Sequence, residues 1–570
     1  MIRRRKAGGT TLLRRLEALR HTYGGDAERE KIGLLGGLER CRLPAARAVT
    51  RLHEALCLLR AYPDGPELLA RVERMLAGFA GRSDLRRHAR ALVNSGIAGT
   101  PIDCCFYWFT ARWLAERWPD RLSIAWDDFE DVDVLDRRLA RLVPYAESLA
   151  LDETDLETAE WVRRLKGPAE TDAAFVVRRF AALGAGSFLR ESYFEEPDVP
   201  FRLAAGPDTP SRTRARWAAS PVVFQGAPPD RSRAGFRPAL AAPLLRVRSA
   251  PRREARALIA LAREAMVTRD RDLDAFVHAD PDDVRVVDCG GGLEFACYGA
   301  APARRQMLDA VYGFLVLRNG VPTGYVLSAS LFGSTEIAYN VFETFRGMEA
   351  ATTFGRALAV VRELFGADTF VLDPYQLGHD NNEGLRSGAW WFYYKLGFRP
   401  RDARTKRLVR AELRKLRANP RHRSGIATLR KLAATEMFLY LGRRRADVLG
   451  LVSRANVGLH VVRHLSERYG ADRERGVRAC ARAAATRLGL RSLGTLPRGE
   501  RLAWERWAPL VQVLPGVERW PRADRMALAR VIRAKGGRRE AEFVARFDRH
   551  RRLRRAVLAL ARSDPYGLRA

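Results

Sequence analysis

The stretch from Asp373 to Gly388 holds the densest group of side chains that can exchange protons or hydrogen-bond to a substrate. It reads Asp-Pro-Tyr-Gln-Leu-Gly-His-Asp-Asn-Asn-Glu-Gly-Leu-Arg-Ser-Gly, which places carboxylates, carboxamides and one imidazole close together. Such groups orient polar substrates and act as general acids and bases. We predict that this loop lines a site or replaces part of one, with a solvated insertion as the alternative. Its substrate-binding candidates are Asp373, Tyr375, Asn381, Asn382 and Glu383.

The elements that must position this loop begin where the periodicity changes near residue 243. The Asn319-Gly320 pair predicts a tight hairpin between two runs of strand-forming residues. Expected strands are 244–247, 284–288, 293–298, 312–317, 323–331, 336–342, 369–372 and one starting at Phe398, and expected helices are 252–267, 350–365 and 388–396. A strand meander followed by alternating helices and strands predicts a mixed α/β sheet with helices on both faces.

Three segments of this region occur in the order and spacing of a known family. They are Tyr312-Gly-Phe-Leu-Val-Leu-Arg-Asn-Gly-Val-Pro-Thr-Gly-Tyr325, Val341-Phe-Glu-Thr-Phe-Arg-Gly-Met-Glu-Ala-Ala351 and Ala389-Trp-Trp-Phe-Tyr-Tyr-Lys-Leu-Gly-Phe398. Together they resemble the middle strands, the cofactor loop and the closing signature of GNAT-superfamily N-acetyltransferases. The resemblance covers residues from about 243 to 402 and implies the fold and the chemistry of that family.

The resemblance implies acetyl-CoA or another acyl-CoA as cofactor. Backbone N–H groups at a helix start bind a pyrophosphate without a cationic side chain. The implied cofactor-binding residues are Val341, Phe342, Arg346, Gly347, Met348, Ala350 and Ala351. The family's loop is Arg-Gly-x-Gly-x-Gly/Ala, and Glu349 stands here in place of the middle glycine. A carboxylate costs on the order of 1 kcal/mol beside a pyrophosphate unless it points away, although acidic side chains also stabilise a helix start.

The resemblance also implies a direct attack of an amine on a thioester. It places the acid that protonates the leaving thiolate at Tyr393, with Tyr394 as second choice, and a core position is the alternative for either ring. For the base, Glu343 ends a strand that Glu336 opens, and alternation puts the two on opposite faces. Glu343 is the first choice, and His379 and Asp373 are alternatives. Backbone N–H groups of Val341 or Phe342 are expected to hold the thioester carbonyl.

The chain on either side of this region has a different character. Residues 1–196 show helical apolar stripes and predict a mostly helical domain. Residues 197–242 contain many prolines among glycine, serine and arginine, which predicts an irregular linker with a short strand at 222–224. Residues 403–570 again predict helices, the last of them spanning 540–561. Four parts are therefore expected: a helical domain, a linker, the GNAT-like domain and a basic helical region.

Charge and cysteine content limit the possible environments and partners. Residues 401–570 hold 43 basic against 15 acidic side chains, which predicts an anionic partner such as nucleic acid, an acidic protein or a membrane surface; a solvated helix face is the alternative. Seven cysteines without Cys-x-x-Cys or zinc spacing indicate small buried residues in a reducing compartment. Without an apolar segment after the basic Met1–Lys6 or a membrane-length apolar run, the expected location is cytoplasmic.

Two functions remain open on the sequence alone. The first is an N-acyltransferase that moves an acyl group, most simply acetyl, from CoA or a carrier thioester to a small amine, an aminoacyl group or a protein amine. The second is a catalytically inactive GNAT-like scaffold whose arginine-rich C-terminal helices bind nucleic acid or another anion. A hybrid, in which those helices deliver an anionic substrate to the transferase site, combines the two.

Overall fold

The computed structural model describes residues 8–184, 188–218 and 221–567, and these divide into two compact units. Unit 1 comprises Met1–Pro228, Ala257–Val277 and Leu317–Pro322, and unit 2 comprises Pro229–Arg256, His278–Val316 and Thr323–Ala570. The basic segment Met1–Lys6 lies outside the described residues. This division differs from the expected boundary near residue 243. Unit 2 already begins at Pro229, and unit 1 includes the later segments Ala257–Val277 and Leu317–Pro322.

Unit 1 is mostly helical, as the apolar stripes predict. Its three-stranded sheet has β3 (Phe201–Leu203) between β1 (Ile102–Cys104) and β2 (Leu122–Ile124). Its helices are α1 (Gly9–Leu19), α2 (Gly25–Arg40), α3 (Ala46–Ala61), α4 (Pro66–Ala77), α5 (Ser83–Arg87), α6 (Trp108–Arg117), α7 (Val132–Leu142), α8 (Ser148–Glu153), α9 (Thr158–Leu165), α10 (Asp172–Ala181), α11 (Phe188–Glu195) and α14 (Asp274–Val277).

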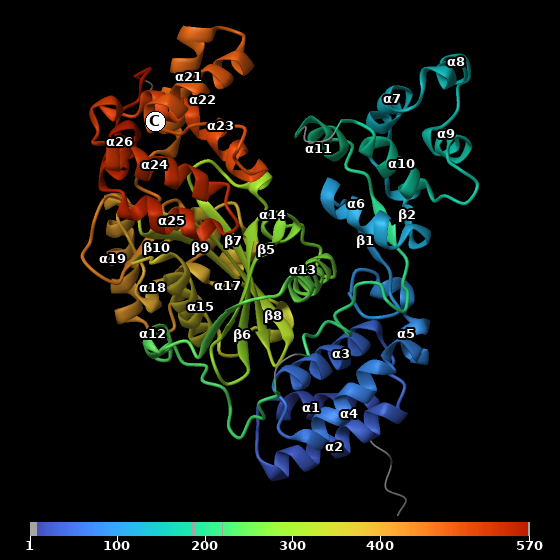
Figure 1. The fold of residues 1–570 in the computed structure, drawn as a ribbon. Helices are drawn as coiled ribbons and strands as arrows, with labels where there is room; N and C mark the ends of the chain where they lie inside the picture. The colour runs from blue at the N-terminus through green and yellow to red at the C-terminus, as the bar shows by residue number, and fades with distance from the viewer. Residues whose placement is uncertain (1–7, 185–187, 219–220, 568–570) are drawn as a thin grey trace, which may run out of the picture. The chain divides into compact units, whose positions relative to one another are not determined.

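Unit 2 is built on a mixed sheet of nine strands, which confirms the α/β class (Figure 1). The strand order is β11-β12-β10-β9-β8-β7-β6-β5-β4. The strands are β4 (Arg246–Ser249), β5 (Ala279–Asp288), β6 (Leu293–Ala300), β7 (Ala310–Arg318), β8 (Val321–Leu331), β9 (Ser334–Val341), β10 (Thr369–Leu372), β11 (Arg399–Pro400) and β12 (Met437–Tyr440). Asn319 and Gly320 both have positive φ, 48° and 77°, as the expected hairpin turn requires.

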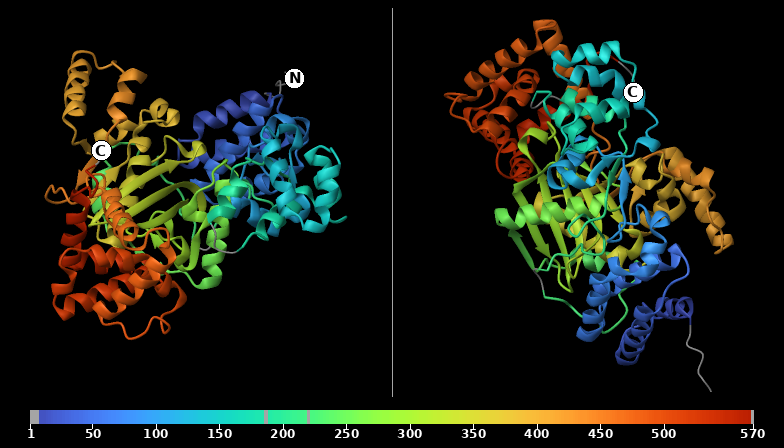
Figure 2. Two further views of the ribbon diagram at one scale, coloured as in Figure 1. Left: turned by 90° about the horizontal axis from the view of Figure 1, so that it is seen from above. Right: turned by 90° about the vertical axis from the view of Figure 1, so that its right-hand side faces the viewer.

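The helices of unit 2 precede, separate and follow the strands in sequence, and many of them contribute to the same hydrophobic core. They are α12 (Phe236–Ala241), α15 (Ala350–Phe365), α16 (Pro374–Leu377), α17 (Asn382–Ser387), α18 (Ala389–Leu396), α19 (Ala403–Ala418), α20 (Ile426–Ala433), α21 (Arg454–Tyr469), α22 (Arg473–Leu488), α23 (Arg498–Val513), α24 (Arg522–Lys535), α25 (Glu540–Arg549) and α26 (Arg551–Arg562), and α13 (Arg252–Val267) runs from unit 2 into unit 1. The two views of Figure 2 show α21–α26, orange to red, gathered near one end of the sheet.

The expected boundary at residue 402 does not hold in the structure. Strand β12, which lies in the part expected to be helical, pairs with β10 and β11 and completes the sheet. One hydrophobic core joins Phe295 and Val326 of the sheet to Trp507 and Phe547 of the C-terminal helices. The basic region therefore folds with the sheet, because its helices bury apolar faces against it.

Two further expectations need correction. The expected linker 197–242 is irregular over most of its described residues, but it contains β3 and α12, and residues 222–224 do not form the expected strand. The expected helix 540–561 is broken at His550 into α25 and α26, since the His550 side chain accepts a hydrogen bond from Leu553 N–H and starts a new helix.

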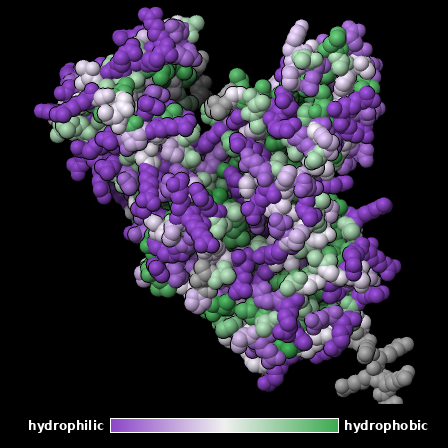
Figure 3. All heavy atoms as spheres, turned by 45° about the vertical axis from the view of Figure 1, so that its right-hand side comes forward, coloured by the Kyte–Doolittle hydropathy of each residue, from purple (hydrophilic) through white to green (hydrophobic). Residues whose placement is uncertain are grey.

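On the face drawn in Figure 3, hydrophilic side chains cover most of the surface and hydrophobic ones are interspersed among them. Among the described residues, every helix is too short or too polar to cross a lipid bilayer.

A half-buried carboxyl group beside the β8–β9 turn gives a first testable prediction. Asp548 on α25 accepts a hydrogen bond from Gly333 N–H at 2.9 Å. Burial raises its pKa from 3.8 to about 6, and Arg554 and that hydrogen bond oppose the shift. The folded state therefore binds this proton more tightly than the unfolded chain, and stability falls as pH rises from about 4 to about 6.

Asp548→Asn keeps an acceptor for Gly333 and removes this titration. When the pH rises from 4.5 to 7.5, the free energy of unfolding of the wild type should fall by roughly 1–3 kcal/mol relative to that of the variant. Urea denaturation at both pH values measures the change. If the difference in unfolding free energy between the two proteins is the same at both pH values, Asp548 is already ionised at pH 4.5.

Candidate active site

Strands β9 and β10 are parallel neighbours that separate after a short shared stretch. They pair at only three positions, from Ser334 with Thr369 to Glu336 with Val371. Strand β10 ends at Leu372 because Asp373 caps the next helix, its Oδ1 accepting from Tyr375 N–H at 2.8 Å, and Pro374 opens that helix. Among the described residues, the last part of β9 up to Val341 thus has no strand beside it on this edge.

The side chain of Gln376 fills part of this opening. Its Nε2 donates to the carbonyl oxygen of Tyr339 on β9 at 2.9 Å and to the hydroxyl oxygen of Tyr393 on α18 at 2.6 Å. The Tyr393 hydroxyl is therefore held beside the unpaired edge of β9. The sequence pattern indicated Tyr393 but not Gln376, although Gln376 lies inside the polar stretch.

Tyr393 is buried, with 3% of its surface exposed, and its ring packs edge-on against Phe354 and Phe398. Burial raises the pKa of the Tyr393 hydroxyl well above its ordinary value, and the hydrogen bond from Gln376 partly opposes this. Among the described residues no acceptor takes the hydroxyl proton. Tyr393 is thus both a core residue and a proton donor without an acceptor, so the two sequence interpretations do not exclude each other.

The loop from β9 to α15 leaves some backbone N–H groups available. The amide of Phe342 donates to Thr323 O at 3.0 Å, so it does not serve as the expected donor to a thioester carbonyl. Amides alternate along a strand, which directs that of Val341 to the opposite, unpaired edge. Met348 and Ala350 donate within the loop, whereas the amides of Ala351 and Thr352 have no partner among the described residues.

Glu349 does not close the start of α15. Its side chain is buried and makes no capping hydrogen bond to the first-turn amides. Burial raises the pKa of Tyr339, and the charges of Tyr393 and Glu349 add to that increase, so the carboxylate lies near the Tyr339 hydroxyl. The hydroxyl of Thr352 is buried without a hydrogen-bond partner. The start of α15 therefore keeps a small polar site, formed by the amides of Ala351 and Thr352 and the Thr352 hydroxyl, which we call the cradle.

Two arginines flank this cradle. Arg346 forms an ion pair with Glu383 and donates weakly to Val341 O at 3.4 Å. Arg231, from the segment expected to be linker, donates to Gly347 O at 2.7 Å. Gly347 has φ of 82°, a conformation that glycine adopts without strain. The structure thereby joins a cofactor-binding candidate, Arg346, to a substrate-binding candidate, Glu383, and adds a cation that the sequence did not reveal.

The polar loop also borders a cavity of about 600 Å³. Its lining residues are His379, Asp380, Asn381, Asn382, Leu385, Arg430, Lys431 and Ala434. Asn381 is structural as well, because its Oδ1 accepts from Gly384 N–H at 2.9 Å and caps α17. Arg430 and Lys431 on α20 have no acidic partner among the described residues. This cavity suits a polar molecule that carries an anionic group.

The candidate bases lie in different surroundings. Glu343 is exposed, and His379 is half-exposed beside Asp380. Among the described residues no hydrogen bond joins either of them to Tyr393. Glu336 is half-buried on β9; burial raises its pKa, and the carboxylates of Asp373 and Glu436 add to the shift. Of the remaining substrate-binding candidates, Tyr375 is 60% exposed and Asn382 is exposed at the cavity.

Comparison with models of protein families, with curated proteins and with solved structures gives no significant match, so the chain has only its own residues and geometry to indicate a function.

Proposed function

We propose that unit 2 is an acyl-CoA-dependent N-acyltransferase of the GNAT type, which transfers an acyl group to an amine. The observation that carries the proposal is the opening between the parallel strands β9 and β10. At this opening Gln376 ties the hydroxyl of Tyr393 to the unpaired edge of β9, directly before a helix start with available amides. A thioester and a pyrophosphate need this combination of a proton donor, a strand edge and an anion cradle.

The residues present fit the donor molecule, and each has a distinct task. Acyl-CoA supplies a thioester whose carbonyl carbon accepts the amine as the carbon–sulfur bond breaks. The amides of Ala351 and Thr352, with Arg231 and Arg346, are proposed to hold the pyrophosphate. The amide of Val341 is proposed to hold the thioester carbonyl, and Tyr393 to give its proton to the departing sulfur.

Among the base candidates, Glu336 has the surroundings best suited to removing a proton from the amine. Burial raises its pKa above the ordinary value, which makes the carboxylate a stronger base, and Arg454 lies 3.7 Å from its Oε2. The cavity beside His379, Arg430 and Lys431 is proposed to receive the acceptor. Its two unpaired cations favour an amine that also carries a carboxylate or phosphate.

The ion pair between Arg346 and Glu383 gives the binding test. Arg346→Gln removes the cation beside the cradle, and we expect the affinity for acetyl-CoA to fall about three- to tenfold. Glu383→Gln releases Arg346 toward the pyrophosphate, so its affinity should instead rise about twofold or more. Isothermal titration calorimetry with acetyl-CoA and CoA measures both.

Arg362→Gln is the matched control, because Arg362 is exposed at the far end of the same helix, α15. It should bind acetyl-CoA as the wild type does. Absence of acetyl-CoA binding in the wild type, or equal losses for Arg346→Gln and Arg362→Gln, would count against the proposed site.

The second candidate function, an inactive domain that binds an anion through its C-terminal helices, also has one specific observation in its favour. This is an arginine-lined pocket between α24, α25 and α26. The two functions use different residues of unit 2, so each can be tested without the other.

A further inference from the structure

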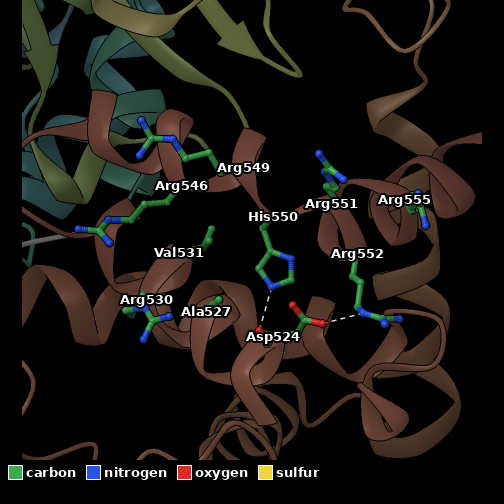
Figure 4. A pocket seen from close by; sticks show the side chains of 10 residues that line it. All are labelled: Asp524, Ala527, Arg530, Val531, Arg546, Arg549, His550, Arg551, Arg552 and Arg555. Carbon is green, nitrogen blue, oxygen red and sulfur yellow. Dashed lines mark hydrogen bonds and ion pairs between the residues drawn. The ribbon is translucent and has the colours of Figure 1, made fainter. Parts of the chain in front are cut away.

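A cavity of about 590 Å³ lies between α24, α25 and α26 of unit 2, away from the residues of the proposed transferase site (Figure 4). Six arginines and a single carboxylate line it, together with a histidine and two small apolar residues. The lining residues are Asp524, Ala527, Arg530, Val531, Arg546, Arg549, His550, Arg551, Arg552 and Arg555. Figure 4 shows His550, Ala527 and Val531 in the middle and the guanidinium groups around them.

Most of this positive charge is uncompensated. Arg552 Nε donates to Asp524 Oδ2 at 2.6 Å, which uses the only carboxylate of the lining. Arg546 has a distant partner in Glu542, 4.0 Å away on the same helix. Arg530, Arg549, Arg551 and Arg555 have no acidic partner among the described residues. Like charges around one pocket repel one another, so an anion bound between them is favoured.

The position of Arg551 adds to this imbalance. Arg551 and Arg552 begin α26, and the first turn of this helix contains no acidic residue. The start of a helix carries partial positive charge, so cations there are unfavourable and anions are favourable. An anion bound here would therefore face both the guanidinium groups and the start of α26.

The frame that holds the arginines is rigid and structural. His550 Nδ1 accepts from Leu553 N–H at 3.2 Å, so its Nε2 carries the proton and donates to Asp524 O at 2.8 Å. Buried Val531, Phe547 and Leu553 fix the three helices to one another. His550 thus joins the start of α24 to the start of α26 and leaves the arginines as the groups that meet a ligand.

We propose that this pocket binds a small, multiply phosphorylated anion. Guanidinium groups form paired hydrogen bonds with phosphate oxygens, and several of them around one cavity match several phosphates on one molecule. A nucleic acid strand fits less well, because the lining offers no aromatic side chain for base stacking other than the imidazole already bonded on both nitrogens.

The test uses the full chain and inorganic tripolyphosphate as probe. We expect calorimetry to show one site per chain, and inorganic orthophosphate to bind at least about tenfold more weakly because it carries a single phosphate. In Arg549→Gln/Arg551→Gln the affinity for tripolyphosphate should fall at least about tenfold. The matched control Arg478→Gln/Arg482→Gln removes two exposed arginines of α22 and should bind as the wild type does.

Three outcomes would overturn the proposal. They are no binding of tripolyphosphate, equal losses in the two double variants, and orthophosphate binding as tight as that of tripolyphosphate. Pocket-dependent binding of duplex or single-stranded DNA more tightly than tripolyphosphate would instead identify a nucleic acid site. Titration of acetyl-CoA distinguishes this pocket from the transferase site. Arg549→Gln/Arg551→Gln should bind acetyl-CoA as the wild type does, whereas Arg346→Gln should bind it more weakly.

Discussion

Lys535→Met is expected to lower the free energy of unfolding of the protein by about 3–5 kcal/mol. Lys535 Nζ donates to Glu540 Oε1 at 2.5 Å and to Asp309 O at 2.6 Å, and both side chains of the pair are almost completely buried. Removing the ammonium group leaves the Glu540 carboxylate without its partner in the core, where an unpaired charge is costly. Urea denaturation monitored by circular dichroism measures the loss.

Lys535 and Glu540 belong to a buried network of two cations and two carboxylates, completed by Arg305 and Asp283. Arg305 lies 3.9 Å from both Asp283 and Glu540, and Tyr312 donates to Asp283 at 2.5 Å. Burial lowers the pKa of Lys535 and raises that of Glu540, and the attraction between the two opposes both shifts. The network fixes the start of α25 to strands β5 and β7.

The double variant Lys535→Met/Glu540→Leu provides the control. It removes both charges and leaves Asp283 opposite Arg305, so it should be more stable than Lys535→Met alone. If Lys535→Met costs less than about 1 kcal/mol, or if the double variant is the less stable of the two, the buried pair does not behave as a coupled unit.

Tyr393→Phe is expected to lower kcat for the proposed acyl transfer at least about 100-fold while KM for acetyl-CoA changes little. The ring remains in its packed position, but the hydroxyl proton is lost beside the unpaired edge of β9. The departing thiolate must then take its proton from water, so the loss falls on the transition state. Initial rates with acetyl-CoA and an amine that supports turnover measure the effect.

Tyr394→Phe is the matched control for this prediction. Tyr394 lies next along α18, and its ring stacks on Trp390, but no hydrogen bond of its hydroxyl is found among the described residues. Its removal should leave kcat within about threefold of the wild type. A full rate in Tyr393→Phe, or the larger loss in Tyr394→Phe, would assign the acid elsewhere. Thermal unfolding of both variants checks that the fold is intact.

Local sequence signals predicted the elements of the sheet region well. The expected helices 252–267 and 350–365 and the strand 369–372 coincide with α13, α15 and β10. These elements have apolar periodicity that matches their own geometry, and turns such as Asn319-Gly320 mark their ends. Their order also predicted the α/β class, because alternating elements restrict how a sheet can form.

Other parts of the fold carried no such signal. Strand β12 is four apolar or aromatic residues, Met-Phe-Leu-Tyr, and only its pairing with β10 makes it a strand. The apolar pattern of residues 540–561 continues across His550, and the break there depends on the His550 side chain, which caps α26 and also donates to Asp524 O of another helix. Arg231 lies in a proline-rich segment, whose approach to Gly347 no local pattern reveals.

The candidate site divides in the same way. Residue types alone indicated which side chains can act as acids, bases or cations, including Tyr393, Arg346 and those of the polar loop, because residue type fixes acidity and charge. The packed fold was needed to show that Gln376 holds Tyr393 beside β9, that Glu383 pairs with Arg346, and that arginines from three helices surround one pocket. Those contacts join residues far apart in the chain, and their formation depends on how helices and strands pack rather than on any local pattern.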